Sequence, residues 1–189
     1  MHHITVYCGA SHGRRPAHRQ AAAEFGSALA EAGLGLVYGG ASTGLMGAVA
    51  DAALAGGGTV TGVIPEDLVR HEVAHQGLNR LEVVHGMHER KARMVELGDA
   101  FVAMPGGFGT ADEIFEVLTW AQLGLHGKPC ALLDTDGFFQ PLLAFLRHAA
   151  DEGFVHRRYL DNIIVSDSPR EILSSFAGHR ALPHLFAGV

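Results

Sequence analysis

The residues Met104-Pro105-Gly106-Gly107-Phe108-Gly109-Thr110-Ala111-Asp112-Glu113 separate two segments with different apolar patterns. The segment before the turn, residues 100–104, is apolar throughout, which is typical of a buried strand. After it, apolar residues recur at the spacing i, i+3, i+4 and i+7, which gives a helix one buried stripe: Ile114, Val117, Leu118 and Ala121. The sequence therefore predicts a strand, a glycine-rich turn and a helix that begins at Thr110.

The turn at residues 105–110 has the features of an anion site. Its three glycines permit a sharp turn and let a ligand approach main-chain N–H groups with no Cβ in the way. A helix that begins at Thr110 directs unpaired N–H groups and the positive end of its dipole into the turn, which suits a phosphate. A second interpretation stays open from these residues alone. Thr110 and Glu113 have the spacing of a capping box, in which the glutamate only caps its own helix.

Strands and helices alternate along the rest of the chain. Strands are predicted at residues 4–7, 35–38, 59–64, 81–84, 100–104, 130–133 and 163–165. Helices are predicted at residues 16–33, 45–55, 87–97, from 110 onward, at 137–151 and from the capping box Ser168-Pro169-Arg170-Glu171 onward. This order predicts an α/β fold: a single-domain, Rossmann-like, doubly wound and mainly parallel sheet with helices on both faces. We expect residues 1–189 to form one nucleotide-binding domain.

The composition argues against several classes of protein. The net charge of −6, with histidine neutral, argues against a general nucleic-acid surface. No unbroken apolar run is long enough to cross a bilayer, and the first residues lead directly into a strand without a signal-peptide pattern. The two cysteines, Cys8 and Cys130, make no disulfide framework, which favours reduced thiols in a cytoplasmic protein.

Three turns rich in glycine and small residues follow predicted strands, at residues 8–13, 39–44 and 105–110. In doubly wound sheets, ligands bind outside the carboxyl ends of the strands, at the point where the strand order reverses. Three such turns at one edge favour a nucleotide or a sugar phosphate as the ligand over a purely structural role.

Two motifs taken together resemble those of the LOG ("Lonely Guy") family. They are the pair Arg90-Lys91 and the segment 105–113, which is similar to the family's pattern Pro-Gly-Gly-x-Gly-Thr-x-x-Glu. Residues 8–11 are similar to the family's first loop, and residues 39–47 to its second loop, with Ala41 where glycine is usual. Residues 118–124 continue the resemblance, which extends from residue 4 to about residue 175.

The resemblance implies a phosphoribohydrolase of the cytokinin-activating type. Such an enzyme cleaves the N-glycosidic bond of AMP or an N6-substituted AMP to give a free base and ribose 5-phosphate. Arg90 and Glu113 match the catalytic pair. The implied substrate-binding residues are Ser11, Gly39, Gly40, Glu72, Met87, Lys91, Pro105, Gly106, Gly107, Gly109, Thr110 and Thr119. We expect a homodimer with a small-molecule nucleotide substrate, no cofactor, no metal, and no nucleic-acid or membrane partner.

The residue types agree with this chemistry. Cleavage of the glycosidic bond passes through a ribosyl cation-like state, which a nearby carboxylate such as Glu113 stabilises and from which it can direct water. An arginine such as Arg90 binds a carboxylate or phosphate bidentately with a charge that does not titrate. The sequence leaves open whether Glu113 is a nucleophile or a general base, and it indicates no residue that protonates the departing base.

Two further patterns indicate other chemistries, and the surrounding residues favour neither. The segment His71-Glu72-Val73-Ala74-His75 has the spacing of a zinc metalloprotease helix, but its flanks are irregular, and thirteen histidines make a chance match easy. Proteins of the LOG family often carry the label lysine decarboxylase, a reaction that normally uses pyridoxal phosphate on a lysine. Neither of the two lysines, Lys91 and Lys128, has the expected setting.

The alternative from another functional class is a non-catalytic carrier or sensor of a nucleotide or cofactor. Molybdenum-cofactor carriers have a similar glycine-rich architecture. A carrier requires the phosphate-binding turn but not the glutamate, so the presence of both Arg90 and Glu113 favours the enzyme.

Overall fold

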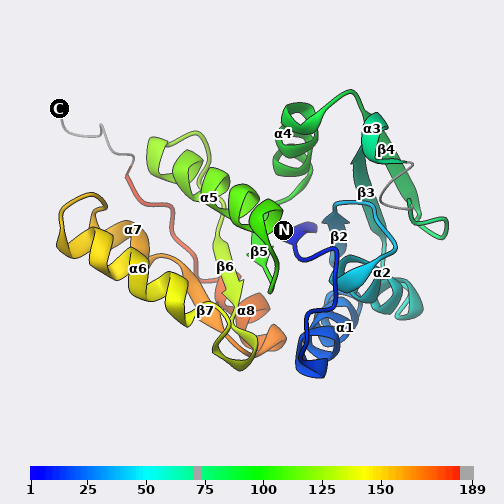
Figure 1. Ribbon diagram of the computed structural model, residues 1–189, viewed down its shortest axis with the longest axis horizontal. Helices are drawn as coiled ribbons and strands as arrows, with labels where there is room; N and C mark the ends of the chain where they lie inside the picture. Colours follow the sequence, from blue (N-terminus) through cyan, green and yellow to red (C-terminus); the bar gives the residue numbers. More distant parts are fainter. Residues whose placement is uncertain (70–73, 184–189) are drawn as a thin grey trace.

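The computed structural model describes residues 1–69 and 74–183, and its central element is a seven-stranded sheet with helices on both sides (Figure 1). The strands are β1 (His3–Tyr7), β2 (Gly35–Tyr38), β3 (Val60–Pro65), β4 (Arg80–Val84), β5 (Ala100–Ala103), β6 (Cys130–Leu133) and β7 (Ile164–Ser166). Every pairing between these strands is parallel. The α/β class predicted from the sequence is therefore confirmed.

The order of the strands reverses beside β1. The sheet order is β4-β3-β2-β1-β5-β6-β7, so the chain proceeds outward from β1 to β4 and then returns to the other side of β1 for β5. Tyr7 at the end of β1 is in register with Ala103 at the end of β5. The turns that follow these two strands meet, because the Gly9 N–H donates a hydrogen bond of 3.0 Å to the Pro105 carbonyl.

Two buried clusters cover the two faces of the sheet. The helices are α1 (Pro16–Glu31), α2 (Gly44–Ala55), α3 (Glu66–Val69), α4 (Met87–Leu97), α5 (Phe108–Leu123), α6 (Gln140–Asp151), α7 (Arg157–Asp161) and α8 (Pro169–Phe176), with a 3-10 turn η1 (Thr135–Gly137). Helices α1, α2 and α8 pack on one face, and α4, α5 and α6 pack on the other. Side chains alternate between the faces along β1, where Ile4 and Val6 join the first cluster and Tyr7 the second.

The start of α5 differs from the sequence prediction. The helix begins at Phe108 with Gly107 at its N-cap, and no side chain caps it. The prediction of a start at Thr110, and the capping box of Thr110 with Glu113, are therefore wrong. Glu113 is the sixth helical residue instead of the third, and it lies one turn further along the helix.

The capping box at α8 is formed only in part. Ser168 is the N-cap, and its hydroxyl accepts a hydrogen bond of 3.4 Å from the Glu171 N–H. The Glu171 carboxylate does not return to the Ser168 N–H. It accepts a hydrogen bond from the Ser166 hydroxyl, which in turn accepts one from the Ser168 N–H. The predicted start of this helix is confirmed, because Pro169 is its first residue.

The two shortest helices, α3 and α7, have no counterpart among the predicted elements. They contain four and five residues, too few to show a helical repeat of apolar side chains. Over the described residues, no helix combines the length and the apolar character that a membrane span requires.

Candidate active site

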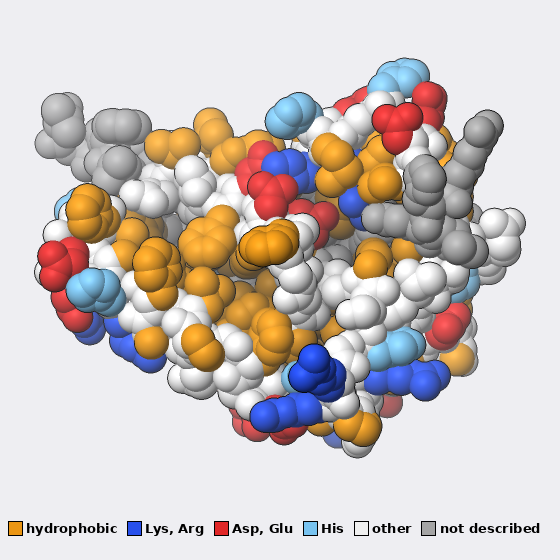
Figure 2. Space-filling view, viewed as in Figure 1, with side chains coloured by type: hydrophobic (Ala, Val, Ile, Leu, Met, Phe, Trp, Pro, Cys, Tyr) orange, Lys and Arg blue, Asp and Glu red, His pale blue; other side chains and the backbone are white. Residues whose placement is uncertain are grey.

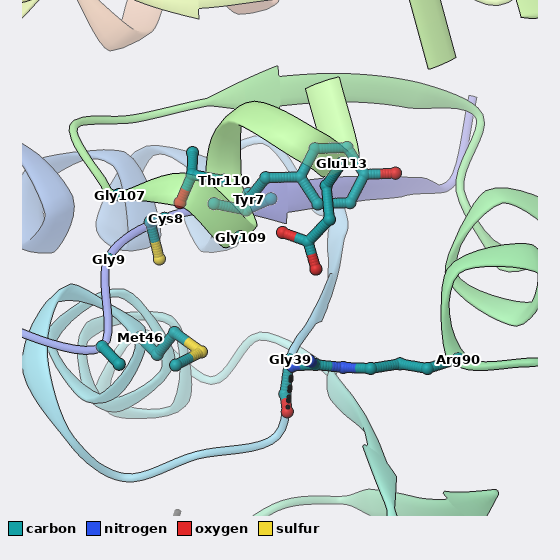
Figure 3. Close-up of a pocket in the computed structure, with 12 residues that line it drawn as sticks. Tyr7, Cys8, Gly9, Gly39, Met46, Arg90, Gly107, Gly109, Thr110 and Glu113 are labelled. Atoms are coloured by element: carbon teal, nitrogen blue, oxygen red, sulfur yellow. Dashed lines mark hydrogen bonds between the residues drawn. The ribbon is translucent and has the colours of Figure 1, made fainter. Parts of the chain in front are cut away.

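A cavity of about 230 Å³ lies at the carboxyl ends of β1, β2 and β5, where the strand order reverses (Figure 3). It is the place that the doubly wound fold predicts for a ligand. The residues that line it come from the ends of β1 and β2, from α2, from α4 and from the first two turns of α5: Val6, Tyr7, Cys8, Gly9, Ala10, Gly39, Met46, Arg90, Gly107, Gly109, Thr110 and Glu113. We call this the catalytic cavity below, after the two residues of the predicted catalytic pair that line it, Arg90 and Glu113.

The glycines of the 105–110 turn serve different purposes. A Cβ at Gly106 would overlap the Thr110 side chain, so the close packing of the turn on its own helix requires glycine there. At Gly107 and Gly109 a Cβ would meet no atom within 4 Å, and neither residue has a positive φ. Neither packing nor backbone conformation requires glycine at these two positions, and both line the catalytic cavity. Their missing side chains keep the main chain at the start of α5 accessible.

Arg90 enters the cavity from α4 and is 6% exposed. Its Nε–H donates to the Val63 carbonyl at 3.1 Å, and Nη2 donates to the Gly39 carbonyl at 3.0 Å. These acceptors belong to the ends of β3 and β2, so the sheet edge fixes the orientation of the guanidinium. A Cβ at Gly39 would overlap this guanidinium, which explains glycine at that position.

Glu113 extends from α5 into the same cavity, across from the Arg90 guanidinium (Figure 3). Arg90 is the one cation and Glu113 the one carboxylate among the described residues that line this cavity. Burial and the nearby Glu113 carboxylate raise the pKa of both the Tyr7 hydroxyl and the Cys8 thiol. Both groups are therefore neutral at pH 7, and the charge of the site comes from the arginine and the glutamate.

Most of the predicted site residues line two adjoining cavities. It brings Gly39, Gly107, Gly109 and Thr110 together with Arg90 and Glu113 in the catalytic cavity. Ser11, Pro105 and Gly106 line a second cavity that adjoins it. Gly40 lines neither cavity, and its φ of 81° gives it a conformational role in the turn after β2. Glu72 lies outside the described residues.

Lys91, Met87 and Thr119 lie at the edges of this arrangement. Lys91 bridges α4 to α5, because its Nζ lies 3.1 Å from Asp112 and 2.7 Å from Glu116. The hydrogen bond to Glu116 raises the pKa of Lys91, so the amine stays charged. The Met87 sulfur contacts Arg90 Nη1 at 3.9 Å. The Thr119 hydroxyl donates to the Phe115 carbonyl of its own helix and lines a separate apolar cavity of about 150 Å³.

Sequence reasoning did not select Tyr7, Cys8 and Met46 as site residues, although all three line the catalytic cavity. Tyr7 ends a predicted strand, and Cys8 begins the glycine-rich turn that follows it. This position at the carboxyl end of a strand is the sequence signal that could have identified both residues. Cys8 and Cys130 are both buried with no disulfide, as predicted, and burial raises the pKa of Cys130 to about 12.

The described part of the zinc-like segment does not resemble a metal site. His75 Nε2 lies 3.0 Å from the Asp51 carboxylate, and His75 Nδ1 accepts a hydrogen bond from the Gly77 N–H. Within residues 1–69 and 74–183, no group of three or more histidine, cysteine, aspartate or glutamate side chains is arranged to hold a metal ion. His71 and Glu72 lie outside the described residues.

Neither lysine amine lies in the catalytic cavity. Lys91 is held between two carboxylates, and Lys128 donates to the Val95 carbonyl at 2.7 Å and lies over the Phe101 ring. Both amines have partners other than a ligand. An aldimine site on a lysine is therefore not supported by either position.

Comparisons of the sequence with known proteins agree on one group of relatives. A family model described as "Possible lysine decarboxylase" matches residues 46–176. The chain is 56% identical over 163 residues to the cytokinin riboside 5′-monophosphate phosphoribohydrolase of Rhodococcoides fascians, which covers 86% of this chain and 82% of the relative. It is 48% identical over 170 residues to the enzyme of that name, LOG, from Oryza sativa subsp. japonica, with 90% and 70% of the two chains covered.

Comparison with solved structures finds the same architecture in more distant proteins. The molybdenum cofactor binding protein from Rippkaea orientalis superposes with a TM-score of 0.72 at 22% identity, over 94% of this chain and 96% of the other. The molybdenum cofactor carrier protein of Chlamydomonas reinhardtii gives the same TM-score, identity and coverage. At this level of identity the likeness shows the fold alone.

Proposed function

Because the chain belongs to the LOG family of cytokinin riboside 5′-monophosphate phosphoribohydrolases, we propose that it hydrolyses the N-glycosidic bond of AMP or an N6-substituted AMP. The products are the free base and ribose 5-phosphate. The observation that carries this proposal is the placement of Glu113 and Arg90 in one cavity beside a turn whose glycines leave the main chain open.

The 5′-phosphate of the substrate binds at the start of α5. The helix begins at Phe108, so its unpaired N–H groups and the positive end of its dipole lie at the Gly107–Thr110 wall of the cavity. The open space at Gly107 and Gly109 supports this placement, because phosphate oxygens must come within hydrogen-bonding distance of the main chain.

Glu113 stabilises the ribosyl cation that forms as the bond between C1′ and the base breaks. Glu113 stands in the second turn of α5 and lines the cavity, which supports a ribose position one helical turn beyond the proposed phosphate-binding N–H groups. Water or the carboxylate itself then adds to C1′, and water completes the hydrolysis. Four titratable side chains are among the described residues that line the cavity: Glu113, Arg90, Tyr7 and Cys8. Tyr7 and Cys8 are both protonated.

Arg90 supplies a fixed positive charge close to this reaction. Its two hydrogen bonds to strand carbonyls hold it in place before any ligand binds. A preorganised positive charge can stabilise the negative charge that develops on the departing base, without a reorganisation cost at the moment of reaction. Lys91 supports this geometry by joining α4, which carries Arg90, to α5, which carries Glu113.

A product assay tests the proposed reaction. Purified protein incubated with AMP, isopentenyl-AMP, GMP or CMP is expected to release free base from one or both adenine nucleotides. Equimolar ribose 5-phosphate should appear with it. Binding of the nucleotide without release of base would instead identify a carrier or sensor.

Gly109→Ala is expected to separate binding from folding. Gly109 is the second residue of α5 and has open space at its Cβ, so alanine should raise stability by up to about 1 kcal/mol through helix propensity. The added methyl projects into the catalytic cavity and should raise KM for AMP about tenfold or more, the equivalent of about 1.4 kcal/mol of binding.

A matched control for this substitution is Gly86→Ala. Gly86 is the N-cap of α4, has open space at its Cβ and lies outside the catalytic cavity. Its KM should stay within about twofold of the wild type, as for most surface substitutions. A Gly109→Ala protein with the KM of the wild type would contradict phosphate binding at this turn. Thermal unfolding and initial rates are the two measurements.

We also infer that the protein forms a homodimer. Apolar side chains gather on the face that α5 and α6 present (Figure 2), and exposed residues include Phe108, Leu125, Phe145 and Phe154. Large exposed apolar patches of this kind mark interaction surfaces. Light scattering coupled to size exclusion would give the mass directly.

Two further proposals concern location and domain organisation. The two buried cysteines without a disulfide support a cytoplasmic location. The two buried hydrophobic clusters pack on the two faces of one sheet, which supports one nucleotide-binding domain.

A further inference from the structure

A second cavity of about 430 Å³ adjoins the catalytic cavity on the side of the first loop. Gly9, Ala10 and Gly107 line both cavities, so the two adjoin at the proposed position of the 5′-phosphate. The reaction proposed above uses only the smaller cavity. The larger one lies where groups attached to that phosphate, on the side away from the ribose, would extend.

Arg14 is the one charged side chain among the described lining residues of the second cavity. His12 and His18 also line it, and no carboxylate is among its described lining residues. Arg15, the residue after Arg14, pairs with the Asp136 carboxylate at 3.6 Å. This distribution contrasts with the net charge of −6 of the whole chain and indicates a local preference for anions.

His18 adds a buried polar group that lacks a partner. The side chain is 8% exposed and stands in the first turn of α1, with its ring against the edge of Phe138. Its Nδ1 is buried and makes no hydrogen bond within the described part of the chain. Buried polar atoms are nearly always paired, so this nitrogen is an exception, and its ring belongs to a residue that lines the second cavity.

We propose that the second cavity binds the phosphate groups beyond the first of a nucleoside diphosphate or triphosphate. The inference rests on the proposed function for the position of the first phosphate at Gly107–Thr110. From that position the next phosphate enters the second cavity, where Arg14 can bind it bidentately and His12 and His18 can donate ring N–H groups. ADP and ATP therefore occupy the catalytic cavity with their nucleoside and compete with AMP.

The experiment compares ATP and ADP as inhibitors of AMP hydrolysis in the wild type and in the double variant His12→Ala/Arg14→Ala. In the wild type we expect competitive inhibition by both. In the double variant the inhibition constant for ATP should rise about tenfold more than the KM for AMP, because the loss of the Arg14 guanidinium and the His12 ring N–H acts on the distal phosphates. Arg19→Ala, which removes a charge from α1 outside the cavity, should leave both constants unchanged.

Calorimetric titration with ATP separates this inference from the proposed function. If AMP is not hydrolysed but ATP still binds more weakly to the double variant, the proposed function fails and the phosphate cavity stands. The inference is overturned if AMP is hydrolysed and ATP does not compete. It is also overturned if the double variant weakens ATP and AMP to the same extent.

Discussion

Replacement of Glu113 by glutamine is expected to lower kcat for AMP hydrolysis by about 10²–10⁴-fold, the contribution typical of a positioned acid–base group. The substitution keeps the size of the side chain and its hydrogen-bonding capacity but removes the negative charge. Glu113 does not act as a helix cap, since Gly107 occupies the N-cap of α5 and no side chain caps the helix. The melting temperature should therefore stay close to that of the wild type.

Asp112→Asn is the matched control for this prediction. It makes the same carboxylate-to-amide change at the preceding residue, whose side chain lies beside Lys91 outside the catalytic cavity. Lys91 retains its shorter contact to Glu116 at 2.7 Å, so activity should fall by about threefold or less, as for a partly exposed ion pair. Wild-type turnover by Glu113→Gln, or an equal loss in both variants, would exclude Glu113 as the catalytic carboxylate.

The second large effect is expected for Arg90→Lys. A lysine keeps the positive charge but carries all its N–H groups on one nitrogen, so it cannot reproduce the separate Nε–H and Nη2–H bonds to the Val63 and Gly39 carbonyls. We expect kcat/KM for AMP to fall by about 10²–10³-fold, the cost typical of removing one preorganised donor. The free energy of unfolding should fall by about 1–3 kcal/mol, because buried hydrogen bonds to a charged group are lost.

Arg93→Lys provides the comparison on the same helix. Arg93 contacts Glu82 at 2.7 Å and Glu96 at 2.6 Å, and it does not line the catalytic cavity. These carboxylates hold the pKa of Arg93 above its usual range, and a lysine can replace the charge. Activity should stay within about twofold of the wild type, as for other surface changes. If Arg90→Lys loses stability but keeps its kcat/KM, the role of Arg90 is structural only.

Much of the fold could be predicted because most of its strands are short apolar runs. Gly35–Tyr38 and Cys130–Leu133 match the predicted bounds, and so does the helix Met87–Leu97. The start of α5 could not be predicted correctly, since a glycine N-cap has no side chain to mark it. The pattern Thr110-x-x-Glu113 therefore gave a stronger signal than the residue that caps the helix.

The candidate site could be predicted as a set of turns but not as a set of contacts. Neighbouring residues on a helix point about 100° apart. Arg90 therefore enters the cavity while Lys91 turns to Asp112 and Glu116. The sequence pairs these two residues in one motif and does not say which faces the ligand. Gly39 and Gly40 are also neighbours with different roles. Gly39 leaves room for the Arg90 guanidinium, and Gly40 provides the positive φ of the turn.

The anchoring of Arg90 limits how this chemistry can be transferred to another protein. The orientation of the guanidinium depends on two strand ends and on a glycine that leaves room for it. A designer who copies the arginine and the glutamate onto a different scaffold obtains two charges without a defined geometry. The arginine has to be transferred together with the sheet edge that holds it, including both carbonyls and Gly39.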